Sequence, residues 1–175
     1  MVAISRGKEE MLSFDEANRI FRYEPETGKL FWRVWRWRRI KPGDEASTVA
    51  TTTGYKIVRV EATYLQHRLA WLLHYGEWPR GLVDHINMNK TDNRISNLRL
   101  ANYSQSNANR RAPKRKGIGT LKGASFLRTK KVWRSSIKVD GKTKNLGDYR
   151  TELEAHLVFC AAVKLRHGSF ARTGP

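Results

Sequence analysis

The chain has 175 residues, of which 34 are Lys or Arg and 16 are Asp or Glu, so its formal net charge is +18. The length allows one medium-sized domain or two small ones, and a single cysteine, Cys160, excludes an internal disulfide and a cysteine-based zinc site. The basic excess predicts a polyanionic partner, because Lys and Arg gain affinity by releasing the ions condensed on phosphates. A solvated basic protein without such a partner is the alternative.

The N-terminal residues lack the apolar core of a signal peptide, and no apolar run approaches the roughly 18 residues of a membrane span. We therefore expect a cytoplasmic protein in a reducing compartment, with no membrane partner. The sequence leaves the oligomeric state open and slightly favours a monomer.

The first part of the chain predicts a small region of helix and strands. Ser13 and Glu16 fit the S-x-x-E capping box, which begins a short helix. An aromatic-rich strand should follow at 30–35, and two short strands within 55–65 should pair as a hairpin. Residues 67–75 then carry the apolar pattern of a helix that nearby Gly and Pro residues end.

Two histidines, His67 and His74, lie on that helix. A lone histidine on an apolar helix is more often a structural hydrogen-bonding residue than a ligand. We interpret both histidines as structural.

The run from Trp32 to Arg39, WRVWRWRR, has two interpretations. It is either an aromatic strand covered by arginines, or a strand that grips DNA, with arginine on phosphate and tryptophan stacking. Under both interpretations we expect its arginines to contact DNA. The predicted contacts are Arg33, Arg36 and Arg38.

The stretch 83–111 contains an Asp-His pair, Asp84 and His85, and seven asparagines. Asn side chains compete for backbone hydrogen bonds and favour turns and caps. We expect a strand, a loop, a second strand and a helix, with Ser104 as the helix cap. These elements fall at 82–86, 87–94, 97–101 and 105–111.

This stretch also carries the residues best suited to chemistry. His85 can take a proton from water at neutral pH, and Asp84 can hold Mg²⁺ or Mn²⁺ through oxygen. Successive strand residues point to opposite faces, so the two share a site only if the strand bends or the metal sits at its edge. A hydrogen-bonded loop without catalytic function is the alternative.

Residues 110–121 are basic and broken by Pro and Gly, which predicts a linker. The linker is either a solvated tether or a tether that lies along DNA, and we favour the second. Its predicted DNA contacts are Arg110, Arg111, Lys114, Arg115 and Lys116.

The residues from 122 onward predict a separate unit of three strands and a helix. Asp140-Gly141 is a hairpin signal between the second and third strands. Thr151 and Glu154 form another capping box, which begins a helix that runs to about residue 166. The side of this helix expected to face the sheet carries Leu153, Leu157, Cys160, Ala161 and Leu165.

The segment 67–111 resembles the HNH endonucleases of bacteriophages, many of which are homing enzymes. The similarity extends over about 14–111, and D-H-I-N, D-N-R-I and N-L-R recur in order at the family's spacing. It implies that His85 is the general base and that Asp84 is a metal ligand. It also implies that Asn97 holds the loop by hydrogen bonds and orients the histidine.

The third motif position, which binds the metal in that family, falls by counting on Ser106. One residue along a helix turns a side chain by about 100°, so Asn107 takes this role only if the helix register is shifted. We favour Asn107, while an inactive site is the alternative. Met88 stands where the family often has glycine, so a turn with positive φ would be strained there.

The C-terminal part, about 122–168, resembles the APETALA-type DNA-binding domain of plant transcription factors, mainly through the segment 146–155. The resemblance implies that a sheet reads the major groove of DNA. Ser125 and Leu127 replace basic residues of the plant domains, so the plant target sequence should not be carried over. The predicted contacts are Lys122, Arg128, Arg134, Lys138 and Lys144, with Trp133 equally consistent with the core.

The expected fold is α+β: a small β/α region leading into a ββα-metal HNH domain, then a three-stranded antiparallel sheet packed on one helix. The expected domains are 1–109, a basic linker at 110–121, and 122–175. The expected function is metal-dependent nicking or cleavage of double-stranded DNA. A DNA-binding regulatory protein with an inactive HNH site is the main alternative, and an RNA-binding protein is a weaker one.

Overall fold

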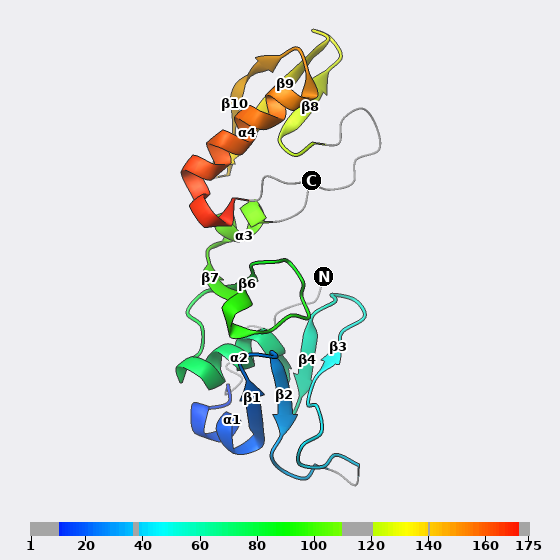
Figure 1. The fold of residues 1–175 in the computed structure, drawn as a ribbon, viewed down its shortest axis with the longest axis vertical. Helices are drawn as coiled ribbons and strands as arrows, with labels where there is room; N and C mark the ends of the chain where they lie inside the picture. Colours follow the sequence, from blue (N-terminus) through cyan, green and yellow to red (C-terminus); the bar gives the residue numbers. More distant parts are fainter. Residues whose placement is uncertain (1–10, 37–38, 110–120, 140, 172–175) are drawn as a thin grey trace. The chain divides into compact units, whose positions relative to one another are not determined.

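A computed structural model describes residues 11–36, 39–109, 121–139 and 141–171 (Figure 1). It confirms the α+β class, with small sheets and a three-stranded antiparallel sheet packed against a helix. The chain divides into two units, Met1–His85 with Asn89–Leu98 (unit 1) and Ile86–Met88 with Arg99–Pro175 (unit 2). No helix within the described ranges is long and apolar enough to cross a membrane.

The capping box predicted at the N-terminus is present and begins α1 (Phe14–Ile20). The Ser13 hydroxyl accepts a hydrogen bond from the Glu16 amide at 3.2 Å, and the Glu16 carboxylate accepts one from the Ser13 amide at 2.9 Å. The Ser13 amide and the Ser13 hydroxyl both donate to this carboxylate, and they hold the pKa of Glu16 below its usual value. Two backbone donors at the helix start are thereby satisfied.

A two-stranded antiparallel sheet follows, formed by β1 (Phe21–Glu24) and β2 (Lys29–Trp32). The strand predicted at 30–35 ends at Trp32. Trp32 pairs with Phe21, the first residue after α1, so no partner strand extends beyond that pair. The β1–β2 hairpin includes the turn between its strands, in which Gly28 has a φ of 71°.

The next sheet is three-stranded, in the order β3-β4-β5, from β3 (Thr48–Val49), β4 (Lys56–Arg59) and β5 (Thr63–Leu65). The antiparallel pairing of β4 with β5 confirms the predicted hairpin. Helix α2 (Gln66–Tyr75) begins directly after β5. It ends at Gly76 in a left-handed conformation, as the sequence predicts.

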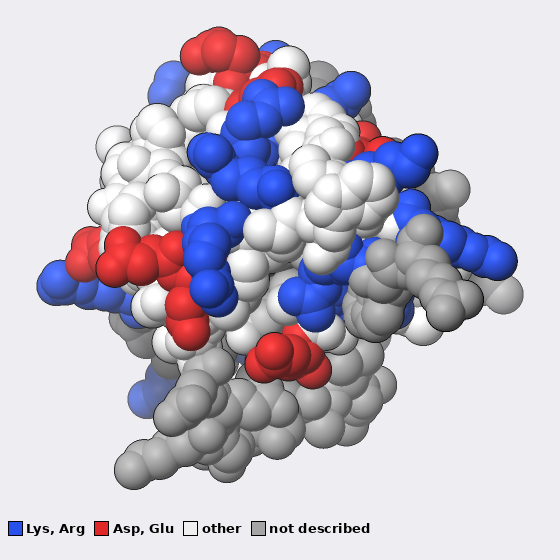
Figure 2. Space-filling view, turned by 90° about the horizontal axis from the view of Figure 1, so that it is seen from below, with Lys and Arg blue, Asp and Glu red and all other residues white. Residues whose placement is uncertain are grey.

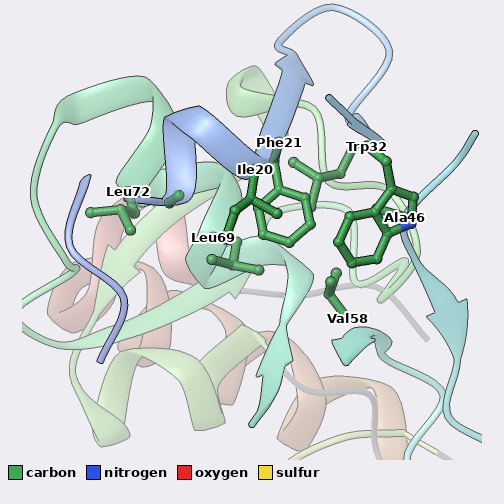
Figure 3. Packing of buried hydrophobic residues seen from close by; sticks show 9 residues of the cluster. Ile20, Phe21, Trp32, Ala46, Val58, Leu69 and Leu72 are labelled. Carbon is green, nitrogen blue, oxygen red and sulfur yellow. The ribbon is translucent and has the colours of Figure 1, made fainter. Parts of the chain in front are cut away.

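The core of unit 1 lies between α1, α2 and the two sheets (Figure 3). The rings of Phe21 and Trp32 lie 4.9 Å apart at its centre. Trp32 is therefore a core residue, whereas Trp35 is 66% exposed. The buried members of the cluster are Ala17, Ile20, Phe21, Leu30, Trp32, Ala46, Val58, Leu69 and Leu72.

Unit 2 contains the predicted three-stranded sheet, in the order β10-β9-β8, and one long helix. The strands are β8 (Ala124–Leu127), β9 (Val132–Val139) and β10 (Lys142–Tyr149), and the helix is α4 (Glu152–His167), which the short 3-10 helix η2 (Gly168–Phe170) follows. The capping box of Thr151 and Glu154 is present at the start of α4. Ile137, Phe159 and Val163 are buried together between sheet and helix.

The prediction of which side of α4 is buried against the sheet is wrong. Leu153, Leu157 and Leu165 are 57%, 58% and 90% exposed, and Ala161 is exposed as well, while Cys160 is half-buried. The helix carries a second stripe, with Phe159 flanked by small or branched residues, and this stripe faces the sheet. An aromatic ring buries more apolar area than a leucine. The Phe159 ring also fills the space over Gly123, where a Cβ would lie 2.0 Å from it.

Helix α3 (Tyr103–Asn109) begins two residues before the predicted start. Its cap is Asn102 rather than Ser104. The Asn102 side-chain oxygen accepts from the Gln105 amide, and the Gln105 side-chain oxygen accepts from the Asn102 amide, both at 2.8 Å. This reciprocal pair needs an amide or acid three residues after the cap, which Gln105 supplies for Asn102.

Candidate active site

The candidate site lies at the end of β6 (Leu82–His85), the strand predicted at 82–86. His85 is only 4% exposed, and Asp84 before it is half-buried. The chain then turns, and Met88 has a φ of 61°. A side chain in this left-handed region is strained, which agrees with the glycine that the resemblance places at this position.

Three side chains from different elements of unit 1 surround the His85 ring. The Oδ1 atom of Asn93, in the loop after β6, lies 2.9 Å from His85 Nε2. The ring of His67, on α2, lies 5.1 Å away, nearly perpendicular to His85. The ring of Tyr55, just before β4, lies 5.9 Å away and is tilted. The imidazole is therefore held within a packed group of polar rings.

Burial lowers the pKa of His85 from its usual value, and it outweighs the opposing effects of the Asn93 hydrogen bond and of the charges of Asp84 and Asp92. His85 is therefore neutral at pH 7. Only the neutral imidazole can accept a proton, so the environment gives His85 the protonation state that a general base requires.

The loop between β6 and β7 (Leu98–Ala101) is fixed by its own polar side chains. Asn97, in the 3-10 helix η1 (Ile95–Asn97), donates from Nδ2 to the Asp92 carbonyl at 2.8 Å. The Asp92 carboxylate accepts from Arg94 at 2.8 and 2.7 Å. Asn97 thus makes a loop contact of the kind that the resemblance implies, while its part in catalysis stays a prediction.

The next question is which side chains near His85 could bind a divalent metal ion. Among the described residues, no group of three His, Cys, Asp or Glu side chains is placed to hold a metal. Mg²⁺, however, commonly binds to one or two carboxylates and completes its shell with water and substrate phosphates. Asp84 fits such a site as a protein ligand. Asn107, exposed on α3 in unit 2, and the half-buried Ser106 stay the predicted alternatives for a further ligand.

The predicted DNA contacts of unit 1 lie after β2. Arg33 is exposed, and its Nε donates to the Phe21 carbonyl at 2.8 Å. Arg36 is half-buried, with its guanidinium 5.6 Å from the Trp32 ring centre. Arg38 lies outside the described residues. Figure 2 looks at the face of unit 1 that carries α1, β1 and β2, and shows Lys and Arg gathered over the middle of that face.

The predicted DNA contacts of unit 2 do not share one face of its sheet. Residues paired across antiparallel strands point to the same side, so Lys144 lies on the side of its buried partner Ile137, which faces α4. Arg134 and Lys138 lie on the opposite, open side. The Arg134 guanidinium donates twice to Asp148, at 2.7 and 2.9 Å.

The remaining predicted contacts are distributed as follows. Lys122 is half-buried and donates to the Ala108 carbonyl at 2.8 Å. Arg128 is exposed in the turn after β8. The linker contacts Arg110, Arg111, Lys114, Arg115 and Lys116 lie outside the described residues.

Sequence reasoning missed Asn93 as a partner of His85, and it gave no indication that His67 lies against the site. Asn93 lies within the D-N-R-I motif, which was the available signal, but nothing in the sequence indicates that its side chain reaches His85. His67 is structural in the sense that it is buried, yet it lies against the site. Its Nδ1 has no hydrogen-bond partner among the described residues.

The buried His67 should make unit 1 sensitive to acid. Burial, with smaller contributions from His85 and Arg68, lowers the pKa of His67 from its ordinary value of 6.5 to about 3. Below pH 6.5 the unfolded chain therefore binds a proton that the folded chain does not, so stability falls as pH decreases from 6.5 towards 3. When the pH is lowered from 7 to 5, the free energy of unfolding should fall in both proteins. The fall should be about 2 kcal/mol smaller in His67→Phe than in the wild type. Urea unfolding of both proteins at the two pH values measures this, and equal losses would contradict it.

Comparison with known proteins identifies the segment that contains this site. Residues 64–108 match the family model described as HNH endonuclease. Protein 3.8 of Escherichia phage T7 is 32% identical to the chain over 108 residues, which cover 61% of this chain and 88% of that protein. No solved structure matches the chain significantly.

These matches support the expected nuclease but not the expected C-terminal DNA-binding domain. The HNH match contains Asp84, His85 and Asn97 and so supports a nuclease. Neither match identifies an APETALA-type domain, so that resemblance and the predicted domain boundaries stay predictions. The chain belongs to the family of phage T7 protein 3.8, and within it residues 64–108 form an HNH endonuclease domain.

Proposed function

We propose that this protein is an endonuclease that nicks or cleaves double-stranded DNA, with His85 as its general base. The observation that carries the proposal is a buried, neutral His85 directly after Asp84, inside the segment that matches the HNH endonucleases. A neutral imidazole beside a carboxylate supplies the two functions that phosphodiester hydrolysis needs most from the protein, a proton acceptor and an anionic ligand.

In this mechanism His85 accepts the proton of the water that attacks phosphorus. Asp84, together with oxygens of the DNA phosphate, would hold Mg²⁺ or Mn²⁺. Such an ion, when bound, stabilises the charge that develops on the phosphate and on the leaving oxygen. The loop hydrogen bond from Asn97 to Asp92 keeps the segment after His85 in place during the reaction.

The basic surface supplies affinity for DNA in this proposal. With a net charge of +18, the protein attracts the phosphate backbone over a wide area. Arg33 and Arg36 extend this surface next to the unit 1 core, and the open side of the unit 2 sheet carries both Lys138 and Arg134. We assign site choice to unit 2, because a sheet with one uncovered face can enter a major groove.

A second candidate function is DNA binding without cleavage. It is favoured by one observation, that the third motif position falls by counting on Ser106. A serine hydroxyl is a weaker ligand for a hard divalent ion than an amide or carboxylate oxygen. A protein of this kind would keep its affinity for DNA and lose hydrolysis.

A plasmid assay separates the two candidates. We expect the wild type to convert supercoiled plasmid to nicked or linear DNA with Mg²⁺ or Mn²⁺ and to leave it intact with a chelator. Asp84→Ala, purified in the same way, controls for contaminating nuclease and should be inactive. Salt-sensitive DNA binding by the wild type, with no cleavage under any of these metals, would favour the regulatory protein.

A further inference from the structure

We infer that Asn93 is a positioning residue, which fixes the orientation and the tautomer of His85 and is itself held in place by the β1–β2 hairpin. The inference rests on the proposed function for its catalytic consequence. Its structural part concerns unit 1 alone and can be tested without catalysis.

The first step is the contact between the two side chains. Asn93 is 1% exposed and His85 is 4% exposed, and Asn93 Oδ1 lies 2.9 Å from His85 Nε2. An interaction this well shielded from water is stronger than the same contact at the surface. The rings of His67 and Tyr55 lie against His85 as well, so rotation of the imidazole would meet side chains from two further elements.

The second step is the tautomer. A neutral imidazole has one N–H donor and one acceptor nitrogen. The Asn93 Oδ1 atom can only accept, so His85 Nε2 carries the proton. Nδ1 is then the basic nitrogen, and it is the atom that takes the proton from water. Asn93 thus decides which edge of the ring performs the chemistry.

The third step is the support of Asn93 by the β1–β2 hairpin. The Tyr23 hydroxyl, on β1, donates to the Asn93 carbonyl at 2.7 Å. Two residues further along, the Ile95 amide donates to the Pro25 carbonyl at 3.2 Å. One hydrogen bond from a side chain and one from the backbone therefore hold the loop on both sides of residue 94.

Gly28 completes this support from the same hairpin. A Cβ atom on Gly28 would lie 2.3 Å from the Arg94 nitrogen and 2.5 Å from the Asn93 carbonyl carbon, so the two backbones are in direct contact. The Gly28 carbonyl accepts a hydrogen bond from Gln66 Nε2 at 2.7 Å, and Gln66 is fully buried. Gln66 is the neighbour of His67, whose ring also lies against His85.

The β1–β2 hairpin lies outside the segment that matches the HNH endonucleases, residues 64–108. Through Tyr23 and Gly28 it nevertheless determines the position of Asn93. Residues 21–32 thus support the active site of this protein, although they supply no catalytic group.

The test compares Asn93→Ala, Asn93→Asp and Tyr23→Phe with the wild type. We expect Asn93→Ala to lower kcat for plasmid nicking roughly 10- to 100-fold, as losing a partner that orients a functional histidine does, with an unchanged KM for DNA. Asn93→Asp keeps an acceptor oxygen and should recover part of kcat. Tyr23→Phe should lower kcat less, and Tyr64→Phe, a half-buried tyrosine of the same unit, should have no effect.

The second readout is the ring ¹⁵N NMR spectrum of His85 in the full chain. In the wild type we expect the Nε2-protonated tautomer, and in Asn93→Ala a mixture of both tautomers. A wild type that is protonated at Nδ1 would mean that Asn93 donates through Nδ2, and it would overturn the inference, as would an unchanged kcat in Asn93→Ala. If the wild type does not cleave DNA, the proposed function fails, while the wild-type spectrum still decides on the tautomer even where Asn93→Ala does not fold.

Discussion

Replacing His85 by alanine should lower the rate of plasmid nicking by about 100- to 10,000-fold, the range that general base catalysis contributes. The side chain is neutral in its buried position, and the His67 imidazole beside it is a much weaker base, because burial lowers the pKa of His67 to about 3. Binding to DNA should change little, because the basic surface of the protein is untouched. The measurement is a time course of plasmid nicking with Mg²⁺ or Mn²⁺, together with a binding isotherm at fixed salt.

His74→Ala is the matched control for this variant. His74 lies on α2 in the same unit and is exposed, so its loss should leave both nicking and binding at the wild-type level. Equal nicking by His85→Ala and the wild type would show that cleavage occurs elsewhere in the protein. A circular dichroism spectrum of each variant confirms that the comparison is made between folded proteins.

The second large effect is expected for Gly28→Ala, which should destabilise unit 1 by roughly 3–5 kcal/mol. Part of this cost is backbone strain, because Gly28 has a φ of 71°. The larger part is overlap, because the new Cβ would lie 2.3 Å from the Arg94 nitrogen, and both partners are backbone atoms that cannot move alone. Urea unfolding monitored by tryptophan fluorescence measures the loss, since all tryptophans but Trp133 belong to unit 1.

Gly76→Ala is the control that separates the cost of backbone strain from the cost of atomic overlap. Gly76 has a φ of 79°, and a Cβ there would meet no atom within 4 Å. It should therefore cost only the roughly 1–2 kcal/mol of a left-handed alanine. If the two variants were equally stable, the close approach of the β1–β2 hairpin to the loop after β6 would be refuted.

The parts of the fold that the sequence predicts well are those set by neighbours along the chain. The capping boxes of α1 and α4 need one side chain and another three residues later, and both pairs form the expected hydrogen bonds. The hairpin of β4 and β5 and the end of α2 at Gly76 are likewise local. Such features depend little on the rest of the protein.

The errors arise where the sequence offers two local solutions and tertiary packing chooses between them. Helix α4 has two apolar stripes, and only the sheet, through the space over Gly123, selects the one with Phe159. The cap of α3 is Asn102 rather than Ser104 because Gln105 completes a reciprocal pair. The strand β2 ends early because α1 leaves no strand beyond Phe21 to pair with it.

In the candidate site, too, the sequence predicts what neighbouring residues determine and misses what tertiary packing determines. The sequence indicates Asp84 and His85 because they are adjacent and belong to a recognisable motif. Asn93, His67 and Tyr55 reach His85 from a loop, from α2 and from the residue before β4, and the folded core brings them together. No pattern of spacing encodes a contact between side chains that are separated by up to 30 residues.

The pair of Arg134 and Asp148 has a consequence for the way a partner would meet the open side of the unit 2 sheet. Free arginine side chains carry about 2 kcal/mol of rotamer entropy, and the two hydrogen bonds to Asp148 already restrict this guanidinium. The Arg134 guanidinium is therefore held in one orientation before any ligand binds. A ligand that replaced the carboxylate would need a matching pair of acceptors, so the sheet would discriminate by geometry rather than by charge alone.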